Sequence, residues 1–211
     1  MQASLLLPSL IRIFVLMKNI VFDLGGVLFA RDAEKCTPEF IDFFAFIRRE
    51  PMPRFWEEYD RGTSTLADVT ETLCATHGCP RAKCAEYLQR SIEMQEPVRP
   101  TEALVRDLKA AGYRLYVLSN MSREFIAFLR RFPVYGLFDG EVVSCEEGSV
   151  KPERRIYEIL LDRYGLDPSE TLFIDDRPAN IAAAARLGIR GKLFNARHPE
   201  AACGELRAEL L

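Results

Sequence analysis

The chain has 211 residues, 48% of them hydrophobic and 28% charged, which is enough to bury a sizeable core and excludes a disordered polar chain. Its net charge of -3 provides no basic surface for nucleic acid or for an anionic membrane. The six cysteines form no Cys-x-x-Cys pair, which favours reduced thiols in a cytoplasmic protein over a zinc site or a disulfide framework.

The first sixteen residues contain an apolar run similar to the core of a secretory signal. No basic segment precedes this run, Pro8 and Arg12 interrupt it, and it is too short to span a bilayer. Met17 directly precedes a plausible first strand of a domain. We therefore expect residues 1–16 to be a non-native or unstructured extension and Met17 to be the natural start of the protein.

The first expected strand, residues 19–22, is short, apolar and rich in β-branched residues, and it ends in Asp23. Gly25 and Gly26 follow almost at once. A carboxylate at the tip of a buried strand is costly unless it is paired, hydrogen-bonded or bound to a metal. Asp23 therefore either caps a turn before the glycines or belongs to a functional site, and this stretch alone does not decide between the two.

Residues 33–96 have a helical pattern. Thr37 followed by Pro38 is a typical helix start, Thr65 can cap a second helix, and Pro80 can open a third. An aromatic segment around Trp56 is expected to form one more helix. We expect an inserted subdomain of four short helices, called the cap here.

The remaining chain alternates strands with helices. Thr101 is expected to cap a helix that ends before Gly112, and further strands are expected in residues 113–118, 138–144, 172–174 and 191–194. This order is typical of β-α-β units in a parallel sheet covered on both faces. The prediction is an α/β fold, a three-layer Rossmann-like parallel sheet. Its core comprises residues 17–32 and 97–211, with the cap of residues 33–96 inserted after the first strand.

Polar residues follow three of these strands where each strand ends. Since the carboxyl ends of parallel strands meet at one edge of the sheet, we expect these side chains to converge. They are Asp23, Ser119, Asn120, Asp175 and Asp176.

Three carboxylates at one edge repel one another unless a cation intervenes, and all-oxygen ligands suit Mg²⁺. Lys151 could bind phosphate oxygens, and Ser119 and Asn120 could donate hydrogen bonds to them. No His-based mechanism is indicated, so Asp23 is the candidate nucleophile for an aspartyl-phosphate intermediate. The expected partner is a small phosphorylated metabolite, with neither nucleic acid nor membrane involved; the sequence does not decide between a monomer and a homodimer.

Four short motifs follow one another along the chain in the order found in the haloacid dehalogenase (HAD) superfamily of phosphohydrolases, and they resemble the motifs of that superfamily. The resemblance extends over the chain from Met17. The cap resembles the helical C1-type cap of one branch of that superfamily. The sequence is similar to the α-glucose-1-phosphate phosphatase group and to the phosphatase domain of soluble epoxide hydrolases, which implies a Mg²⁺-dependent phosphatase that favours sugar phosphates. The motifs are Phe-Asp-Leu-Gly-Gly-Val at 22–27, Leu-Ser-Asn at 118–120, Lys-Pro at 151–152 and Ile-Asp-Asp-Arg-Pro-Ala-Asn at 174–180.

The resemblance implies a role for each matching position. Asp23 would be the nucleophile and a Mg²⁺ ligand, and Ser119 and Lys151 would bind phosphate. The backbone carbonyl of Gly25 and the carboxylate of Asp176 would also bind the metal, and Asp175 would do so directly or through water. Asn180 would either orient the acidic pair or simply begin a helix, and the second interpretation is favoured.

One departure from the family pattern concerns Gly25, where many family phosphatases carry a second Asp that serves as acid and base. Such a group typically contributes about 10²- to 10⁴-fold to the rate. Asp32 is a possible substitute, and so are three acids of the cap, Glu57, Glu58 and Asp60.

Two other functions stay open. A metal-independent 2-haloacid dehalogenase would also lack the second acid, although family dehalogenases do not carry the pair Asp175 and Asp176. A non-catalytic member would bind a phosphorylated ligand without hydrolysing it. Substrate choice is expected to depend on the cap, with Trp56, Tyr59 and Arg61 as candidate contacts.

Overall fold

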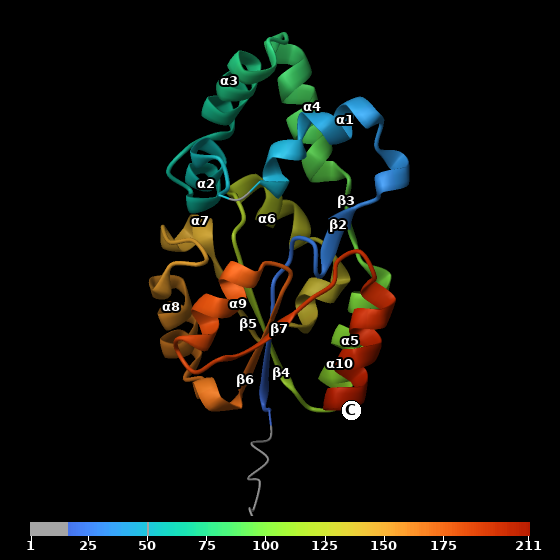
Figure 1. The fold of residues 1–211 in the computed structure, drawn as a ribbon, viewed down its shortest axis with the longest axis vertical. Coiled ribbons are helices and arrows are strands. Elements are labelled where there is room, and N and C mark those ends of the chain that lie inside the picture. Colours follow the sequence, from blue (N-terminus) through green and yellow to red (C-terminus); the bar gives the residue numbers. More distant parts are fainter. Residues whose placement is uncertain (1–16, 50) are drawn as a thin grey trace, which may run out of the picture.

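The computed structural model describes residues 17–49 and 51–211, and these form two units stacked along the long axis (Figure 1). We call them the sheet unit and the helical unit. The expectation for residues 1–16 lies outside the described residues. None of the described helices is long and apolar enough to cross a membrane.

The sheet unit contains a five-stranded parallel sheet with strand order β5-β4-β1-β6-β7. The central strand β1 pairs with β4 on one side and with β6 on the other, and all four of its residues are buried. This confirms the predicted α/β fold with its parallel sheet. The strands are β1 (Asn19–Phe22), β4 (Arg114–Ser119), β5 (Gly140–Val143), β6 (Thr171–Asp175) and β7 (Arg190–Leu193).

Helices cover both faces of the sheet, because alternate strand residues point to opposite faces. Ile20 and Phe22 of β1 pack in the same cluster as residues of α5 and α10, whereas Val21 packs with residues of α8 and α9. The three layers are visible in Figure 1, with α8 and α9 on one side of the strands and α5 and α10 on the other. The helices of this unit are α5 (Arg99–Ala110), α6 (Arg123–Leu129), α7 (Ser144–Glu147), α8 (Arg154–Tyr164), α9 (Pro178–Ala185) and α10 (Pro199–Leu210), with short 3-10 turns at Pro133–Leu137 and Pro168–Glu170.

The start of α5 differs from the prediction. The helix begins at Arg99, so Thr101 does not cap it but is fully buried within its first turn. The physical reason is Pro100, which fits the first turn of a helix, where its missing N–H has no partner to lose.

The helical unit has a core rich in aromatic residues, which also includes Phe125 of α6 in the sheet unit. The Thr37 side chain accepts a hydrogen bond from the Phe40 N–H, and Thr65 forms a reciprocal capping box with Asp68, as expected of helix starts. Where the cap begins and ends as a domain stays a prediction. The helices are α1 (Pro38–Phe43), α2 (Arg54–Arg61), α3 (Leu66–His77) and α4 (Arg81–Glu93), with 3-10 turns at Ala33–Lys35 and Ala45–Arg48.

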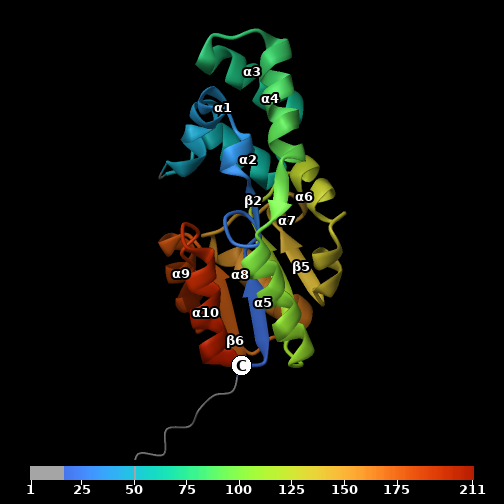
Figure 2. The same ribbon diagram turned by 90° about the vertical axis from the view of Figure 1, so that its right-hand side faces the viewer.

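The two chain segments that join the units pair with each other. Strand β2 (Phe29–Arg31) runs antiparallel to β3 (Gln95–Pro97), and the Val98 N–H extends the ladder by donating to the Leu28 carbonyl. Figure 2 shows β2 between the two units, with the green strand before α5 beside it. Nothing in the local sequence of these two segments predicts this two-stranded connection.

The helical unit also contacts the sheet unit at Gly62, which follows α2 and has φ 78°. A Cβ at this position would lie 2.5 Å from the Cys145 carbonyl oxygen, in α7. Gly62 therefore serves two needs, a left-handed helix end and a close approach between the two units.

Replacing Gly62 with alanine is therefore expected to lower the free energy of unfolding by about 3 kcal/mol or more, because left-handed strain and a backbone clash add up. Gly78→Ala is the matched control: Gly78 ends α3 with φ 61°, and an added Cβ would have no neighbour within 4 Å. We expect the control to lose only about 1 kcal/mol. Equal losses in urea unfolding would show that the contact between α2 and α7 is not formed in solution.

Candidate active site

The predicted polar residues do meet at the carboxyl edge of the sheet. Asp23 follows the central strand, and its backbone N–H donates to the Ile174 carbonyl of β6, which brings it beside Asp175 and Asp176. The three carboxylates each offer an oxygen, and these oxygens lie within 4.8 Å of one another. Among the described residues this is the one such cluster of potential metal ligands.

Lys151 lies between two of these carboxylates. It is 4% exposed, and its Nζ is 2.8 Å from Asp23 Oδ1 and 2.7 Å from Asp175 Oδ2. The same ammonium donates to the Leu118 carbonyl at 2.9 Å. Burial opposes its charge, but the two carboxylates outweigh burial and raise the pKa of Lys151. A solvated loop lysine would have none of these contacts.

Asp23 has two unequal oxygens. Its Oδ1 accepts hydrogen bonds from the Leu24 N–H at 2.7 Å and from Ser119 Oγ at 3.0 Å, in addition to the ion pair with Lys151. Within residues 17–49 and 51–211, no hydrogen bond or ion pair reaches Oδ2. One oxygen therefore fixes the carboxylate and the other stays available to a ligand. Burial raises the pKa of Asp23 to about 7, although Lys151 opposes this shift.

Unlike those of Asp23, both oxygens of the Asp175 carboxylate have protein partners. Its Oδ1 accepts from the Arg177 N–H at 2.8 Å, its Oδ2 binds Lys151, and the Asn180 amide donates to both oxygens at 3.0 Å. Asn180 lies in the first turn of α9, but these bonds show that it also orients Asp175, so the interpretation of it as a simple helix-start residue is wrong. The sequence placed it one helical turn after the acidic pair, which was the signal for its orienting role.

Asp176 is half-buried, and its carboxylate packs closely over Gly26. A Cβ on Gly26 would come within 2.6 Å of Asp176 Oδ2, and the φ of 80° also requires glycine there. Burial and the neighbouring Asp175 raise the pKa of Asp176.

The donor set fits a divalent cation. It consists of carboxylate oxygens, which Mg²⁺ prefers, and Lys151 supplies one positive charge against three carboxylates. A bound Mg²⁺ would balance the remaining charge.

Asn120 is placed differently from the expected phosphate donor. Its Nδ2 donates to the Lys151 carbonyl at 2.8 Å, and its Oδ1 accepts from the Lys151 N–H at 2.7 Å. The amide group is therefore engaged with the Lys151 backbone and positions that residue. Ser119, by contrast, has its hydroxyl directly on Asp23.

The three cap residues expected to contact substrate have protein partners in the structure. Trp56 lies in the aromatic core of the helical unit, where its ring centroid is 5.2 Å from that of Phe46. The Tyr59 hydroxyl donates to Glu124 at 2.8 Å. Arg61 donates to both oxygens of Glu153, at 2.6 and 3.0 Å. Tyr59 and Arg61 thus join the helical unit to the sheet unit.

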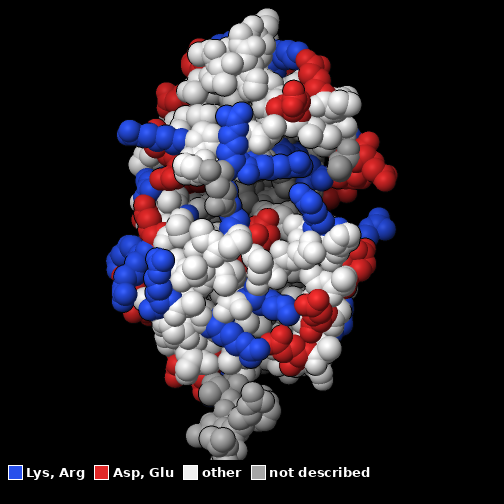
Figure 3. All heavy atoms as spheres, viewed as in Figure 1, with Lys and Arg blue, Asp and Glu red and all other residues white. Residues whose placement is uncertain are grey.

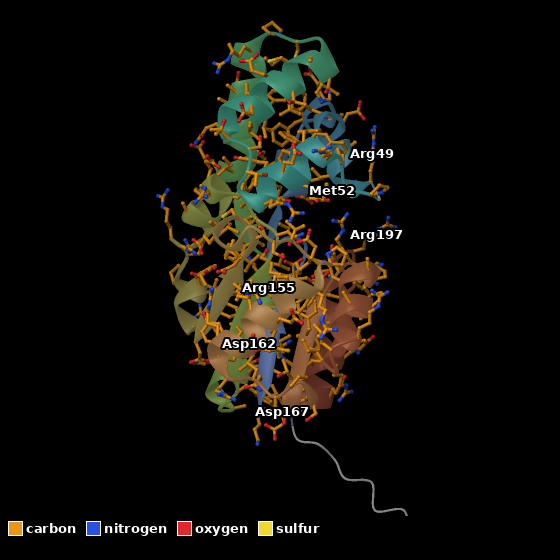
Figure 4. The ribbon with its side chains drawn as sticks, turned by 90° about the vertical axis from the view of Figure 1, so that its left-hand side faces the viewer. Arg49, Met52, Arg155, Asp162, Asp167 and Arg197 are labelled. Carbon is orange, nitrogen blue, oxygen red and sulfur yellow. The ribbon has the colours of Figure 1, made fainter. Side chains whose placement is uncertain are left out.

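Positive side chains border the space above the strand edge, and local sequence patterns did not single them out. Figure 3 shows a recess between the two units with Lys and Arg around it and an acidic group at its lower border. In Figure 4, Arg49 and Met52 of the helical unit lie opposite Arg197 of the sheet unit. The Arg177 side chain spans the units by donating to the Arg49 carbonyl at 3.3 Å.

The four proposed substitutes for the acid missing at Gly25 differ in their partners. Three of them form ion pairs: Asp32 with Lys35, Glu57 with Arg61 and Glu58 with Arg54.

Asp60, the fourth, is 9% exposed, and its carboxylate has no hydrogen bond or ion pair to any residue that the structure describes. Burial raises the pKa of Asp60 to about 8, against the opposing charge of Arg177.

This pKa predicts a dependence of stability on pH. The Asp60 carboxyl group has a pKa near 3.8 in the unfolded chain and about 8 in the folded chain. Between these two pH values the folded chain binds the proton more tightly than the unfolded chain does. The free energy of unfolding of the wild type should therefore fall as pH rises through this window. The asparagine in Asp60→Asn cannot titrate, so this variant should not show this fall in the free energy of unfolding. One pKa unit corresponds to about 1.4 kcal/mol, or roughly 3–6 °C in melting temperature for a chain of this size.

We therefore expect the melting temperature of Asp60→Asn to rise relative to wild type by several degrees between pH 5 and pH 8.5. Differential scanning calorimetry at both pH values measures this, and Asp42→Asn, an exposed cap acid, is the control. A constant difference between Asp60→Asn and wild type would contradict the raised pKa.

Comparisons with known proteins identify the family of the chain. A family model for haloacid dehalogenase-like hydrolases matches residues 17–188. The sesquiterpene phosphatase astK of Aspergillus oryzae is 30% identical over 192 residues, which cover 90% of this chain and 95% of that protein. The glyceraldehyde 3-phosphate phosphatase of Methanothermobacter thermautotrophicus is 34% identical, over 87% of this chain and 76% of that protein.

A solved structure has a similar fold. It is a HAD family enzyme from Bacteroides thetaiotaomicron in complex with magnesium and inorganic phosphate, 26% identical with a TM-score of 0.65, and the match covers 85% of this chain and 95% of that one. Two further curated relatives are much longer, and this chain spans 19% and 34% of their length.

Proposed function

The chain belongs to the haloacid dehalogenase-like hydrolases, and from this we propose that it is a Mg²⁺-dependent phosphatase of small phosphorylated metabolites, with sugar phosphates favoured. We propose Asp23 as the nucleophile of an aspartyl-phosphate mechanism. The observation that carries the proposal is the Asp23 carboxylate, whose Oδ1 is fixed by three donors while Oδ2 has no protein partner in the described chain.

The relatives support this substrate class. They are described as phosphatases of sesquiterpenes, of glyceraldehyde 3-phosphate and of D-ribitol 5-phosphate. The recess with a positive border in Figure 3 suits an anionic substrate, and a related enzyme was solved with magnesium and phosphate.

Each polar residue at the strand edge has a task in this proposal. Asp23 Oδ2 attacks phosphorus, and Lys151 and Ser119 hold the attacking carboxylate through its Oδ1. When the phosphoryl group binds, Lys151 and Ser119 would exchange these bonds for ones to its oxygens. Asp23, Asp176 and the Gly25 carbonyl would hold Mg²⁺, with Asp175 in contact directly or through water. Bound Mg²⁺ would neutralise charge on the phosphoryl group. Asn120 and Asn180 position Lys151 and Asp175.

Phosphate release from a panel of metabolites tests the proposal. The panel contains sugar phosphates, glyceraldehyde 3-phosphate and isoprenoid phosphates, each assayed with Mg²⁺ and with EDTA. We expect release that EDTA abolishes and Mg²⁺ restores. Halide release from 2-haloacids without metal would instead identify a dehalogenase. Binding of phosphorylated ligands with no turnover of any of them would identify a non-catalytic member.

A further inference from the structure

The proposed reaction needs a proton that Gly25 cannot supply. When Asp23 attacks an alkyl phosphate, the departing group leaves as a strongly basic alkoxide unless an acid protonates its oxygen. An acid that serves this purpose must be close to Asp23, shielded from water and protonated at neutral pH.

Asp60 differs from every other acid of α2 in its contacts. Glu57 and Glu58 each pair with an arginine of the same helix, at 2.8 Å in both cases. The Asp60 carboxylate is more deeply buried than either, yet among the residues the structure describes it has no such partner. Ionising a carboxyl group in so buried a residue costs free energy, and acids in such surroundings are common at functional sites.

The backbone at Asp60 is fixed against the sheet unit. Ser144 Oγ donates to the Asp60 carbonyl and accepts from the Met121 N–H, which follows Asn120 at the strand edge. The neighbours of Asp60 on both sides, Tyr59 and Arg61, bond to Glu124 and Glu153 of the sheet unit. Three consecutive residues of α2 are thus anchored, and Figure 1 shows the end of α2 directly above α7.

The charges of the strand edge act on the Asp60 carboxyl group. Asp60 interacts with the charges of Arg177, Asp23 and Lys151, of which the first and last favour its ionised form and Asp23 opposes it. Glu57 opposes ionisation as well. Burial exceeds all of these effects, so the carboxyl group holds its proton at neutral pH.

We propose that Asp60, carried by the helical unit, is the proton donor to the leaving group and replaces the acid absent at Gly25. This inference rests on the proposed phosphatase function. In the first step the bond from Asp23 Oδ2 to phosphorus forms, the bond from phosphorus to the leaving oxygen breaks, and the Asp60 proton moves to that oxygen, which yields an alcohol. In the second step water attacks phosphorus, its proton goes to the Asp60 carboxylate, and phosphate departs from Asp23.

Two substrates that differ in leaving group test this role. p-Nitrophenyl phosphate releases a weakly basic phenolate that needs no proton, whereas glycerol phosphate releases an alkoxide. Hydrolysis of the aspartyl-phosphate is common to both substrates, so the comparison uses kcat/KM, which reports the first step alone. We expect Asp60→Asn to lower kcat/KM about 10²- to 10⁴-fold on glycerol phosphate and less than about 10-fold on p-nitrophenyl phosphate. Asp42→Asn should leave both rates unchanged, because Asp42 is exposed on α1.

The outcomes separate this inference from the proposed function. If Asp60→Asn loses the two activities equally, or loses neither, Asp60 is not the proton donor although the phosphatase proposal stands. If wild-type protein releases phosphate from neither substrate nor from the metabolite panel, the phosphatase proposal itself fails. Retained p-nitrophenyl phosphatase activity reports that a variant is folded, and Asp60→Ser provides a second neutral replacement of smaller size.

Gly25 offers a rescue experiment. An added Cβ there would meet only Met121 Cε, at 4.0 Å, and the φ of Gly25 is not in the left-handed region. We expect Gly25→Asp in the Asp60→Asn background to raise glycerol phosphate turnover at least about 10-fold. Such a selective gain would identify proton transfer as the function lost with Asp60.

Discussion

Replacing Asp23 with asparagine is expected to abolish phosphate release, with a loss in kcat of about 10⁴-fold or more. The amide has nearly the shape of the carboxylate but is not a nucleophile, and it cannot form a stable bond to phosphorus. Because Asp23 is buried beside two other acids, the neutral variant should fold and melt at or above the wild-type temperature.

The assay is phosphate release with Mg²⁺ from the best substrate of the panel, accompanied by a melting curve for each variant. Asp162→Asn is a matched control, since Asp162 is an exposed acid of α8 far from the strand edge (Figure 4). Near-native turnover by Asp23→Asn would refute the aspartyl-phosphate mechanism.

Replacing Lys151 with methionine is expected to have the largest effect on stability, about 3–5 kcal/mol in the presence of EDTA. The substitution keeps the length of the side chain but leaves the buried carboxylates of Asp23 and Asp175 without their shared cation. Turnover should fall at least about 10²-fold, because the attacking carboxylate loses the ammonium that holds it. Added Mg²⁺ should restore part of the lost stability by compensating the same carboxylates.

Lys83→Met is the control for this experiment. Lys83 pairs with Glu39 on the surface of the helical unit, and exposed ion pairs contribute about 1 kcal/mol or less. Melting temperatures of both variants with EDTA and with Mg²⁺ give the comparison. If Lys151→Met were as stable as Lys83→Met in EDTA, the buried triad of charges would not exist in solution.

The parallel sheet could be predicted because its strands carry a strong local signal. Residues 19–22, 114–119 and 171–175 are short apolar runs that end in polar residues, and helices separate them. The ladder of β2 and β3 carries no such signal: Arg31, Gln95 and Glu96 are polar. These residues pair because the two connections to the helical unit run side by side, which is a property of the whole fold.

The polar edge of the sheet could likewise be predicted from the sequence, since topology alone brings Asp23, Ser119 and Asp175 together. Contacts between the two units could not be predicted. Whether Tyr59 and Arg61 face substrate or the sheet unit depends on how α2 docks on α7, and that docking depends on a backbone contact at Gly62. The same docking distinguishes Asp60 from the other candidate acids.

The central position of β1 has a consequence for synthesis on the ribosome. Asn19 pairs with Thr171, 152 residues later in the chain, and at about 5–20 residues per second this interval lasts roughly 8–30 s. The helices of residues 38–93 contact one another locally and can fold in that time, whereas β1 has neither neighbour until β4 emerges. The nascent chain therefore carries Asp23 at the end of an apolar strand that has no neighbour until β4 emerges and only one until β6 follows. Such a strand is a natural binding site for a chaperone.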